Sequence, residues 1–316
     1  MERIKWVALC VALTACGHKA SEVRIAAQPP STNNYPTHFA QWLGFYKEEG
    51  VDVAISQIAG ASKVLEAVVG GSAEVGGGVY EQSIQMAAEG RDIVCFVSML
   101  RSPNFAIVGR VKSPAELKGK IVGVSSPGSP SQFYMNHLLL AAGLTPGDVS
   151  IAGVGMGATA VAALENKQVD AAVLFGSAIT EATSRADLAT LADSRTPDGL
   201  KKIFGVEDYP ASCLLARGEW LRANPNSARR IAKAVLRSLA WIREHSPEEI
   251  LARVPAEFRA ASELEAIRAA KQMYSSDGKV HPESAEAVRR VLAESIPKVR
   301  DAKIDLSRTY TNEFIP

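Results

Sequence analysis

Short apolar runs alternate with helix-length amphipathic segments from residue 23 to about residue 107. The runs predict strands at 23–28, 51–58, 74–78 and 93–100, and the helical spacing predicts helices at 37–49, 62–69 and 82–89. Gly50 and Gly90 follow the first and third helices, where glycine commonly ends a helix, and Ser62 is the expected N-cap of the second. Strands that alternate with helices are typical of a parallel sheet covered on both faces.

A second unit of the same kind follows an apolar run at 105–110. Strands are expected at 121–125, 149–154 and 171–175, with helices at 131–142 and 159–167 between them. Ser113, followed by Pro114 and Glu116, predicts a helix start, because serine caps, proline fits the first turn and glutamate completes a capping box.

The pattern changes after residue 219, where long helical segments replace the alternation. Helices are expected at 227–245, 247–254, 261–274 and 282–296, and the last strand at 212–216. We therefore predict an α/β chain with two doubly wound sheets in two lobes. Lobe one would contain residues 23–107 plus 211–316, and lobe two residues 108–210. The chain would cross between them twice, near 105–110 and 209–214, and these crossings would form a hinge.

The N-terminus has the features of an export signal. Arg3 and Lys5 precede an apolar run at 6–15, which is too short to span a membrane, since a span needs about 20 residues. Leu13-Thr14-Ala15-Cys16 resembles a bacterial lipobox, which implies a signal peptide at 1–15, a lipid on Cys16 and a tether at 16–22. We expect an exported protein, lipid-anchored on the periplasmic or cell-surface side. A plain secretory signal, and the choice of inner or outer membrane, stay open.

Composition excludes some classes of function. The 316 residues carry 35 Lys and Arg against 34 Asp and Glu, so the net charge of +1 argues against a nucleic-acid partner. With 47% hydrophobic residues the chain can bury an ordinary core and is not disordered. Cys95 and Cys213 lie in apolar runs, and their sequence context leaves both a disulfide and two inert thiols open.

Candidate ligand contacts follow from a rule for open α/β sheets, whose ligands bind beyond the carboxyl ends of the strands. Six loops satisfy this rule, at residues 29–37, 59–62, 76–80, 126–132, 155–158 and 176–180. The loop at 126–132 is the richest, because it joins three serines, two prolines and a glycine before a helix. No loop holds Arg or Lys, so sulfonates, carboxylates and neutral heterocycles all stay open. The candidate contacts are Ser31, Asn33, Asn34, Tyr35, His38, Ser62, Gly78, Tyr80, Gly128, Ser129, Ser131, Gln132, Gly155 and Phe175.

Several segments, in their order along the chain, resemble a bacterial solute-binding family. They are Tyr35-Pro36 through Ala40-Gln41-Trp42-Leu43-Gly44-Phe45, Gly50-Val51-Asp52-Val53, Gly70-Gly71-Ser72-Ala73, Leu117-Lys118-Gly119-Lys120-Ile121, Ala142-Gly143-Leu144, Ala163-Leu164, Val169-Asp170-Ala171-Ala172 and Thr311-Asn312-Glu313-Phe314. The chain is similar to ABC transporter substrate-binding proteins of the nitrate/sulfonate/taurine and thiamine-precursor group. The resemblance implies a periplasmic-binding-protein fold of the second type, a small-molecule ligand and partner subunits of an ABC permease. It also implies a monomer that is not an enzyme and needs no cofactor or metal.

Two rival functions remain open. Gly153-Val154-Gly155-Met156-Gly157-Ala158 fits a dinucleotide-binding fingerprint, with Asp170 as the ribose acid, so an NAD-dependent oxidoreductase is one alternative. A partner that delivers ligand to a periplasmic sensor is the other. Enzymes that are similar to this family and make a thiamine pyrimidine carry a Cys-rich iron-binding run, and this sequence has none.

Overall fold

A computed structural model describes residues 22–316 of the chain. The expected signal peptide at 1–15, the lipidation site Cys16 and the tether up to residue 21 lie outside the described residues. Within residues 22–316, no helix combines the length and the apolar character that crossing a membrane requires.

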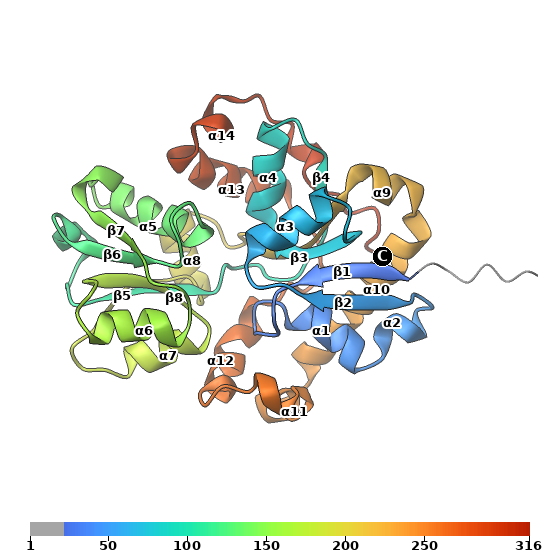
Figure 1. Cartoon of the computed structure of the whole chain (residues 1–316), viewed down its shortest axis with the longest axis horizontal. Coiled ribbons are helices and arrows are strands. Elements are labelled where there is room, and N and C mark those ends of the chain that lie inside the picture. The colour runs from blue at the N-terminus through green and yellow to red at the C-terminus, as the bar shows by residue number, and fades with distance from the viewer. Residues whose placement is uncertain (1–21) are drawn as a thin grey trace, which may run out of the picture.

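Two sheets of five strands stand side by side (Figure 1). The first has the order β2-β1-β3-β10-β4, and the second has the order β7-β6-β8-β5-β9. The strands of the first are β1 (Val23–Ala27), β2 (Val53–Gln57), β3 (Val75–Val79), β4 (Ile93–Ser98) and β10 (Ser212–Arg217). Those of the second are β5 (Phe105–Gly109), β6 (Ile121–Val124), β7 (Ser150–Gly153), β8 (Ala171–Phe175) and β9 (Ala189–Asp193).

Helices cover both sheets, as the alternating pattern predicted. The helices that follow strands of the first sheet along the chain are α1 (Tyr35–Trp42), α2 (Phe45–Glu48), α3 (Ala61–Val69), α4 (Tyr80–Ala88), α9 (Gly218–Ala223) and α10 (Pro225–Glu244). Those that follow strands of the second sheet are α5 (Pro130–Ala141), α6 (Ala158–Glu165), α7 (Ser177–Thr183) and α8 (Pro197–Phe204). The C-terminal helices are α11 (Pro247–Arg253), α12 (Glu263–Ala270), α13 (Pro282–Ser295) and α14 (Pro297–Asp301). Helices α13 and α14 pack beside α4, whereas α12 reaches α7 on the opposite side (Figure 1).

The sheets are mixed, and not parallel as the alternation predicted. Strand β10 runs antiparallel to β3 and β4, and β5 runs antiparallel to β8 and β9. The cause is the two crossings: a strand that arrives from the other sheet enters at the end where its neighbours finish. The crossings occupy residues 99–104 and 205–211, so the segment at 105–110, expected to cross, is strand β5.

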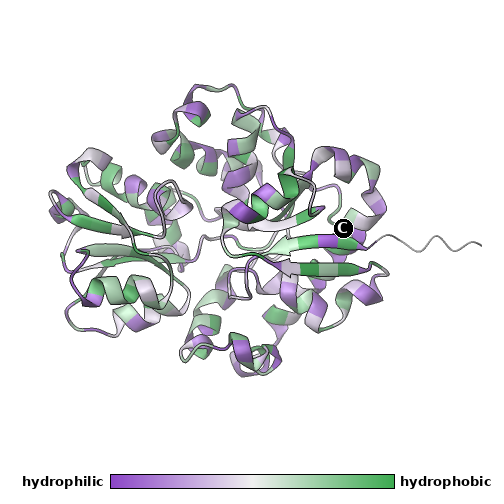
Figure 2. Cartoon of the chain, viewed as in Figure 1, coloured by the Kyte–Doolittle hydropathy of each residue, from purple (hydrophilic) through white to green (hydrophobic). Residues whose placement is uncertain are grey.

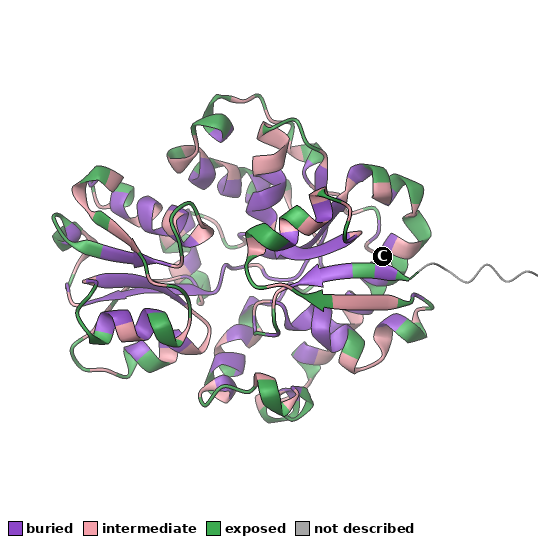
Figure 3. Ribbon diagram, in the orientation of Figure 1, coloured by how far each residue is buried: buried purple, intermediate pink, exposed green. Residues whose placement is uncertain are grey.

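The core follows the strands. Every residue of β4 and β5 is buried (Figure 3), and hydrophobic residues are frequent on the strands (Figure 2). One hydrophobic cluster continues from one sheet to the other, because Ile84 on α4, Tyr134 on α5 and Val288 on α13 all belong to it. The two halves of the molecule therefore pack against each other where α4, α5 and α13 lie.

Three local expectations need correction. Ser62 lies inside α3, whose N-cap is Gly60 with φ 98°, a value that favours glycine. Ser113 precedes only a short 3₁₀ turn, and its hydroxyl donates to Glu116 Oε1 (3.0 Å) instead of capping a backbone amide. Elements α7, β9 and α8 were missed.

Candidate ligand-binding cleft

A cavity of about 320 Å³ lies between the two sheets. Five of the six loops expected from the strand-end rule contribute to its wall, whereas the loop at 176–180 does not. Three come from the first sheet, after β1, β2 and β3, and two from the second, after β6 and β7, while Phe175 at the end of β8 also lines the wall. Leu100 and Pro103 of the first crossing, Ala211 of the second and Ser212 at the start of β10 complete the wall. Its volume falls within the range of small-molecule sites.

The loop after β1 is braced by its own side chains. Asn34 Nδ2 donates to the carbonyls of Gln28 (2.8 Å) and Pro29 (3.1 Å), and the Ser31 amide donates to Asn34 Oδ1 (2.8 Å). His38 Nε2 donates to the same Gln28 carbonyl (3.0 Å). Burial lowers the pKa of His38 below its usual value, although this hydrogen bond opposes the shift. A neutral His38 therefore supports the loop from behind.

The first crossing is tied to this loop. Asn104 Nδ2 donates to Asn33 Oδ1 (2.6 Å) and lies 3.3 Å from Thr32 Oγ1. Asn104 has φ 50°, a conformation that asparagine tolerates better than most residues. One side chain of the crossing thus fixes part of the cavity wall.

Helix α3 begins at the cavity without a side-chain cap. Its first residues, Ala61 and Ser62, line the wall. Gln82 on α4 connects this start to the end of β3, since Nε2 donates to the Ala61 carbonyl (2.8 Å) and Oε1 accepts from the Val79 amide (3.2 Å). Uncapped amides at a helix start are hydrogen-bond donors that carry a partial positive charge.

Three serine hydroxyls form a cluster at the start of α5. The Oγ atoms of Ser125, Ser129 and Ser131 lie 2.7 to 3.0 Å from one another. Ser131 is 1% exposed, and its Oγ also accepts from the Ser125 amide (2.8 Å). Ser129 is the N-cap residue, yet its side chain caps no amide of α5. These hydroxyls can therefore exchange bonds within the cluster for bonds to a ligand.

Aromatic and apolar side chains form the rest of the second-sheet wall. The Tyr134 ring stacks on Phe105, with centroids 4.5 Å apart and planes at 5°. Phe175 ends β8 and tilts against Phe105 at 6.5 Å. Met156, in the loop after β7, is 53% exposed at the cavity rim.

No charged side chain is among the residues that line this cavity in the described part of the chain. The wall offers hydroxyls, carboxamides, backbone amides and aromatic faces. Across residues 22–316 there is also no group of three or more His, Cys, Asp or Glu placed to hold a metal ion. The chemistry available at the wall is hydrogen bonding and ring contact.

The candidate contacts divide into two groups. Those that line the cavity are Ser31, Asn33, Asn34, Ser62, Gly78, Ser129, Ser131 and Phe175. Those placed elsewhere are Tyr35, His38, Tyr80, Gly128, Gln132 and Gly155.

The second group is directed into the protein or to local turns. The Tyr35 hydroxyl donates to Glu263 Oε1 (2.7 Å), and the Tyr80 hydroxyl lies 2.6 Å from Thr309 Oγ1. Gln132 Oε1 accepts from the Gly128 amide (2.6 Å), so these two residues complete a turn. Gly155, with φ 72°, bends the loop that presents its neighbour Met156.

Sequence reasoning missed Gln28, Ser125, Tyr134, Leu100 and Ser212. Ser125 and Gln28 stand directly after strand residues, so the strand-end rule applied one residue earlier would have found them. Tyr134 lies within the predicted helix at 131–142, and nothing in the helical pattern showed that it faces the cavity.

The dinucleotide fingerprint does not fit its surroundings. Its loop follows β7 at the carboxyl edge of the second sheet, and Gly157 opens α6 as expected. Asp170, however, precedes β8, and its Oδ2 accepts from the amide of Ile121 at the start of β6 (2.9 Å). The parallel β6, β7 and β8 begin together, so Asp170 lies at the opposite edge of the sheet. It cannot act as the ribose acid of this loop.

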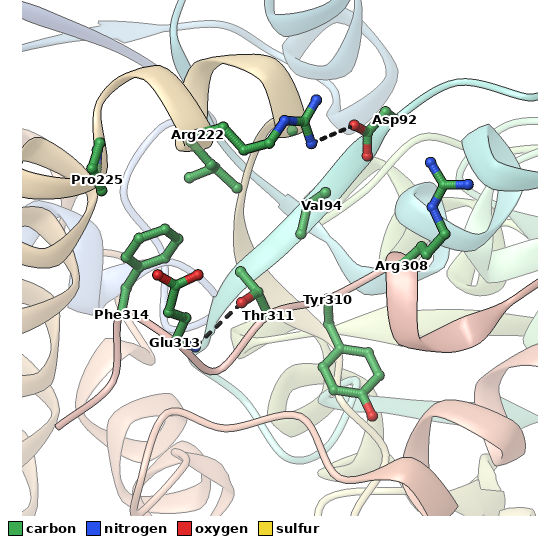
Figure 4. A pocket seen from close by; sticks show the side chains of 11 residues that line it. Asp92, Val94, Arg222, Pro225, Arg308, Tyr310, Thr311, Glu313 and Phe314 are labelled. Carbon is green, nitrogen blue, oxygen red and sulfur yellow. Dashed lines mark hydrogen bonds and ion pairs between the residues drawn. The ribbon is translucent and has the colours of Figure 1, made fainter.

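A second cavity, of about 430 Å³, lies beside the C-terminal segment (Figure 4). Two of its charged residues pair with each other, since Arg222 Nη1 donates to Asp92 Oδ2 (3.0 Å). The Glu313 amide donates to Thr311 Oγ1 (3.2 Å). None of the six strand-end loops reaches this cavity, so the cavity between the sheets is the better candidate.

The two thiols left open by the sequence are free and buried. Cys95 and Cys213 lie on the neighbouring strands β4 and β10. Burial, with the adjacent Cys95, raises the pKa of the Cys213 thiol well above its usual value. Such a thiol is a weak nucleophile.

Comparison with known families gives a match over most of the chain. The family model described as NMT1/THI5 like matches residues 31–250. A protein of Bordetella bronchiseptica RB50 with a solved structure is 34% identical, with 94% of this chain and 96% of that chain covered and a TM-score of 0.83.

More distant solved structures share the fold. The alkanesulfonate-binding protein SsuA from Xanthomonas axonopodis pv. citri, bound to MOPS, is 15% identical, with 93% of this chain and 99% of that chain covered and a TM-score of 0.70. A ligand-binding component of an ABC-type import system from Staphylococcus aureus is 14% identical, with 86% and 90% covered and a TM-score of 0.67. Both are structures of the two-lobed binding-protein type that the sequence predicted.

Curated relatives include a binding protein and an enzyme. YtlA of Bacillus subtilis (strain 168), named as a binding protein, is 23% identical over an alignment of 263 residues that covers 79% of this chain and 75% of YtlA. The 4-amino-5-hydroxymethyl-2-methylpyrimidine phosphate synthase THI11 of Saccharomyces cerevisiae is 24% identical over an alignment of 229 residues that covers 67% of this chain and 64% of the enzyme. The chain therefore spans less than two thirds of the length of the enzyme.

Proposed function

The chain belongs to the NMT1/THI5 like family, and from this premise we propose that it is the extracytoplasmic solute-binding receptor of an ABC importer. The observation that carries the proposal is the cavity between the sheets, to which three strand-end loops of the first sheet, two of the second and Phe175 at the end of β8 contribute. A ligand held there touches both lobes at once. It therefore favours the arrangement in which the lobes are closed, by its differential affinity for that arrangement.

The cavity wall suggests the class of ligand. Hydroxyls, carboxamides and uncapped amides of α3 suit an acceptor-rich group such as a sulfonate or carboxylate, while Tyr134 and Phe175 suit an apolar or ring-shaped body. We propose a small organic ligand, either a sulfonate, a carboxylate or a pyrimidine-like heterocycle. Inorganic ions fit less well, because they would leave the aromatic part of the wall uncovered.

We also propose that the protein binds its ligand without converting it. The wall lacks a cysteine, a histidine and a carboxylate, which are the side chains that nucleophilic or acid–base catalysis uses most. The closed receptor would dock on the permease, as a monomer anchored through the lipid on Cys16. Delivery to a sensor instead of a permease remains the second role compatible with the same cavity.

Thermal unfolding against a ligand panel tests this function. The panel contains alkanesulfonates including MOPS, aromatic carboxylates, pyrimidines, nitrate and NAD. A ligand present at 100 times its Kd is expected to stabilise the folded protein by about 2.7 kcal/mol, which raises the unfolding midpoint. Stabilisation by one organic class, with no product formed on incubation, supports a receptor. Stabilisation by NAD alone, or turnover of a pyrimidine precursor, contradicts it.

A further inference from the structure

A carboxyl group is buried where the two lobes meet, next to the cavity wall. Glu81 on α4 of the first lobe is 0% exposed, and the hydroxyl of Tyr134, from α5 of the second lobe, donates to its Oε1 (2.6 Å). The side chain of Tyr134 also lines the ligand cavity. One residue therefore joins the wall of the ligand site to a carboxyl on the opposite lobe.

Among residues 22–316, no cation forms an ion pair with this carboxyl. Glu81 Oε2 and the Tyr209 hydroxyl are both buried and have no hydrogen-bond partner within residues 22–316. A charged carboxylate that lacks a counter-ion is unfavourable in such a place. Burial accordingly raises the pKa of Glu81 to about 7, although the hydrogen bond from Tyr134 opposes the shift.

Several other titratable groups lie on the elements around Glu81, and most of them have partners elsewhere. Strand β3 has none in its sequence, and the cations of α13 and α14 are engaged elsewhere: Arg290 donates to the Phe204 carbonyl, and Lys298 pairs with Glu89. The groups that interact with Glu81 are Tyr134 on α5, Tyr209 in the second crossing and Cys213 on β10, which lies beside Cys95 on β4. The elements packed around it also carry Tyr80 on α4 itself, Glu283 on α13, the pair of His137 on α5 with Glu294 on α13, the pair of Glu286 with Arg289 on α13, the pair of Arg300 with Asp301 on α14, and Arg217 on β10, which pairs with Glu219.

We propose that closure of the lobes over the ligand takes up one proton from water onto Glu81, so that Glu81 and Tyr134 form a proton-dependent latch. This inference rests on the proposed function, because it requires lobes that open. When the lobes separate, Tyr134 leaves with α5 and water reaches the carboxyl, which then regains ordinary acidity. When they close, the neutral carboxyl keeps the bond from Tyr134 without a buried charge.

The direction of the pH effect follows from proton linkage. Below the usual pKa of 4.5 the carboxyl is protonated in both arrangements and does not discriminate between them. Between 4.5 and about 7 the closed form holds a proton that the open form lacks, so rising pH weakens closure. The closed-to-open ratio is expected to fall by up to about two orders of magnitude across this window, and to stay constant above it.

Small-angle X-ray scattering of the ligand-free mature protein, without the expected signal peptide at 1–15, tests the latch. The radius of gyration of the wild type is expected to rise between about pH 5 and pH 8. Glu81→Gln, which cannot ionise, is expected to remain compact at the upper end. Ser295→Ala is the matched control: it removes another contact between the lobes, the Asn136 Nδ2 to Ser295 Oγ bond (2.9 Å), without a titratable group. It should shift the radius equally at every pH.

Tyr134→Phe gives a second, independent readout. The variant keeps the ring and removes the donor that favours the charged carboxylate, so the midpoint of the pH-dependent opening is expected to move to higher pH. Equal pH profiles for wild type and Glu81→Gln, or an unmoved midpoint in Tyr134→Phe, would overturn the latch. The scattering needs no ligand, so a failed ligand panel and a failed latch are distinguishable outcomes.

Discussion

Ser131 holds the serine cluster at the start of α5 together. Its buried Oγ accepts from the Ser125 amide and contacts both neighbouring hydroxyls. Ser131→Ala leaves that amide without its partner, so unfolding should become easier by about 1–3 kcal/mol. Affinity for the panel ligand that stabilises the wild type should fall as well. Urea unfolding and a titration measure the two effects.

Ser126→Ala is the control for this change. Ser126 also lines the cavity, but it is exposed and its hydroxyl has no hydrogen bond within the described chain. Its removal should alter the free energy of unfolding by less than about 0.5 kcal/mol. Equal losses for the two variants would show that the cluster does not support the loop.

The sequence predicted the loops of the cavity better than the side chains that face it. A loop position follows from where strands end, which the apolar pattern reveals. The direction of a side chain depends on partners far along the chain: Tyr35 turns to Glu263, and Tyr80 to Thr309. Periodicity contains no information about such partners, so it cannot show which side chains of a loop face the cavity and which face the protein interior.

Elements were found where the pattern was strong and missed where it was short. Strand β9 is a partly exposed edge strand of five residues, and α7 has seven. Helix α8 had usable signals, because Thr196 caps it by accepting from the Gly199 amide (3.0 Å) and Gly205, with φ 74°, ends it. The expected helix at 37–49 is divided into α1 and α2 by Gly44, whose φ is 78°.

The packing around strand β3 depends on its glycines, which have no side chain. A Cβ on Gly78 would lie 2.5 Å from Gln82 Oε1 and 2.6 Å from Leu215 Cδ1. Gly78→Ala should therefore displace Gln82 from the start of α3 and lower the free energy of unfolding by about 1–3 kcal/mol. Gly77→Ala is the comparison, since its nearest contact would be Ala27 Cβ at 3.3 Å. Urea midpoints that rank the two variants in the reverse order would contradict this packing argument.

The arrangement of the whole molecule depends on one long-range event. Strand β10 returns from the second sheet and inserts between β3 and β4, more than a hundred residues after either. Local pattern predicted the strand and a double crossing. It could not predict the antiparallel insertion, because neighbouring strands are chosen by the packing of the finished sheets. The same insertion brings both crossings to the cavity wall.

A second titratable group, His137, lies where the lobes meet. His137 on α5 lies 2.7 Å from Glu294 Oε2 on α13, and its Nε2 lies 2.7 Å from the Ile203 carbonyl. Burial lowers the pKa of His137, but these two hydrogen bonds outweigh it and leave the pKa raised. The charged ring therefore adds stability below the unfolded pKa of 6.5, and this contribution is lost as pH rises through the folded pKa.

His137→Gln should consequently be less stable than wild type at about pH 5.5, by on the order of 1 kcal/mol, and the difference should shrink as the pH rises to about 8.5. Glutamine keeps a donor but cannot carry the charge, so hydrogen bonding alone cannot produce this trend. Urea unfolding across the pH series measures it. A constant difference at every pH would mean that His137 joins the lobes as a neutral ring, and that Glu81 alone makes their contact sensitive to protons.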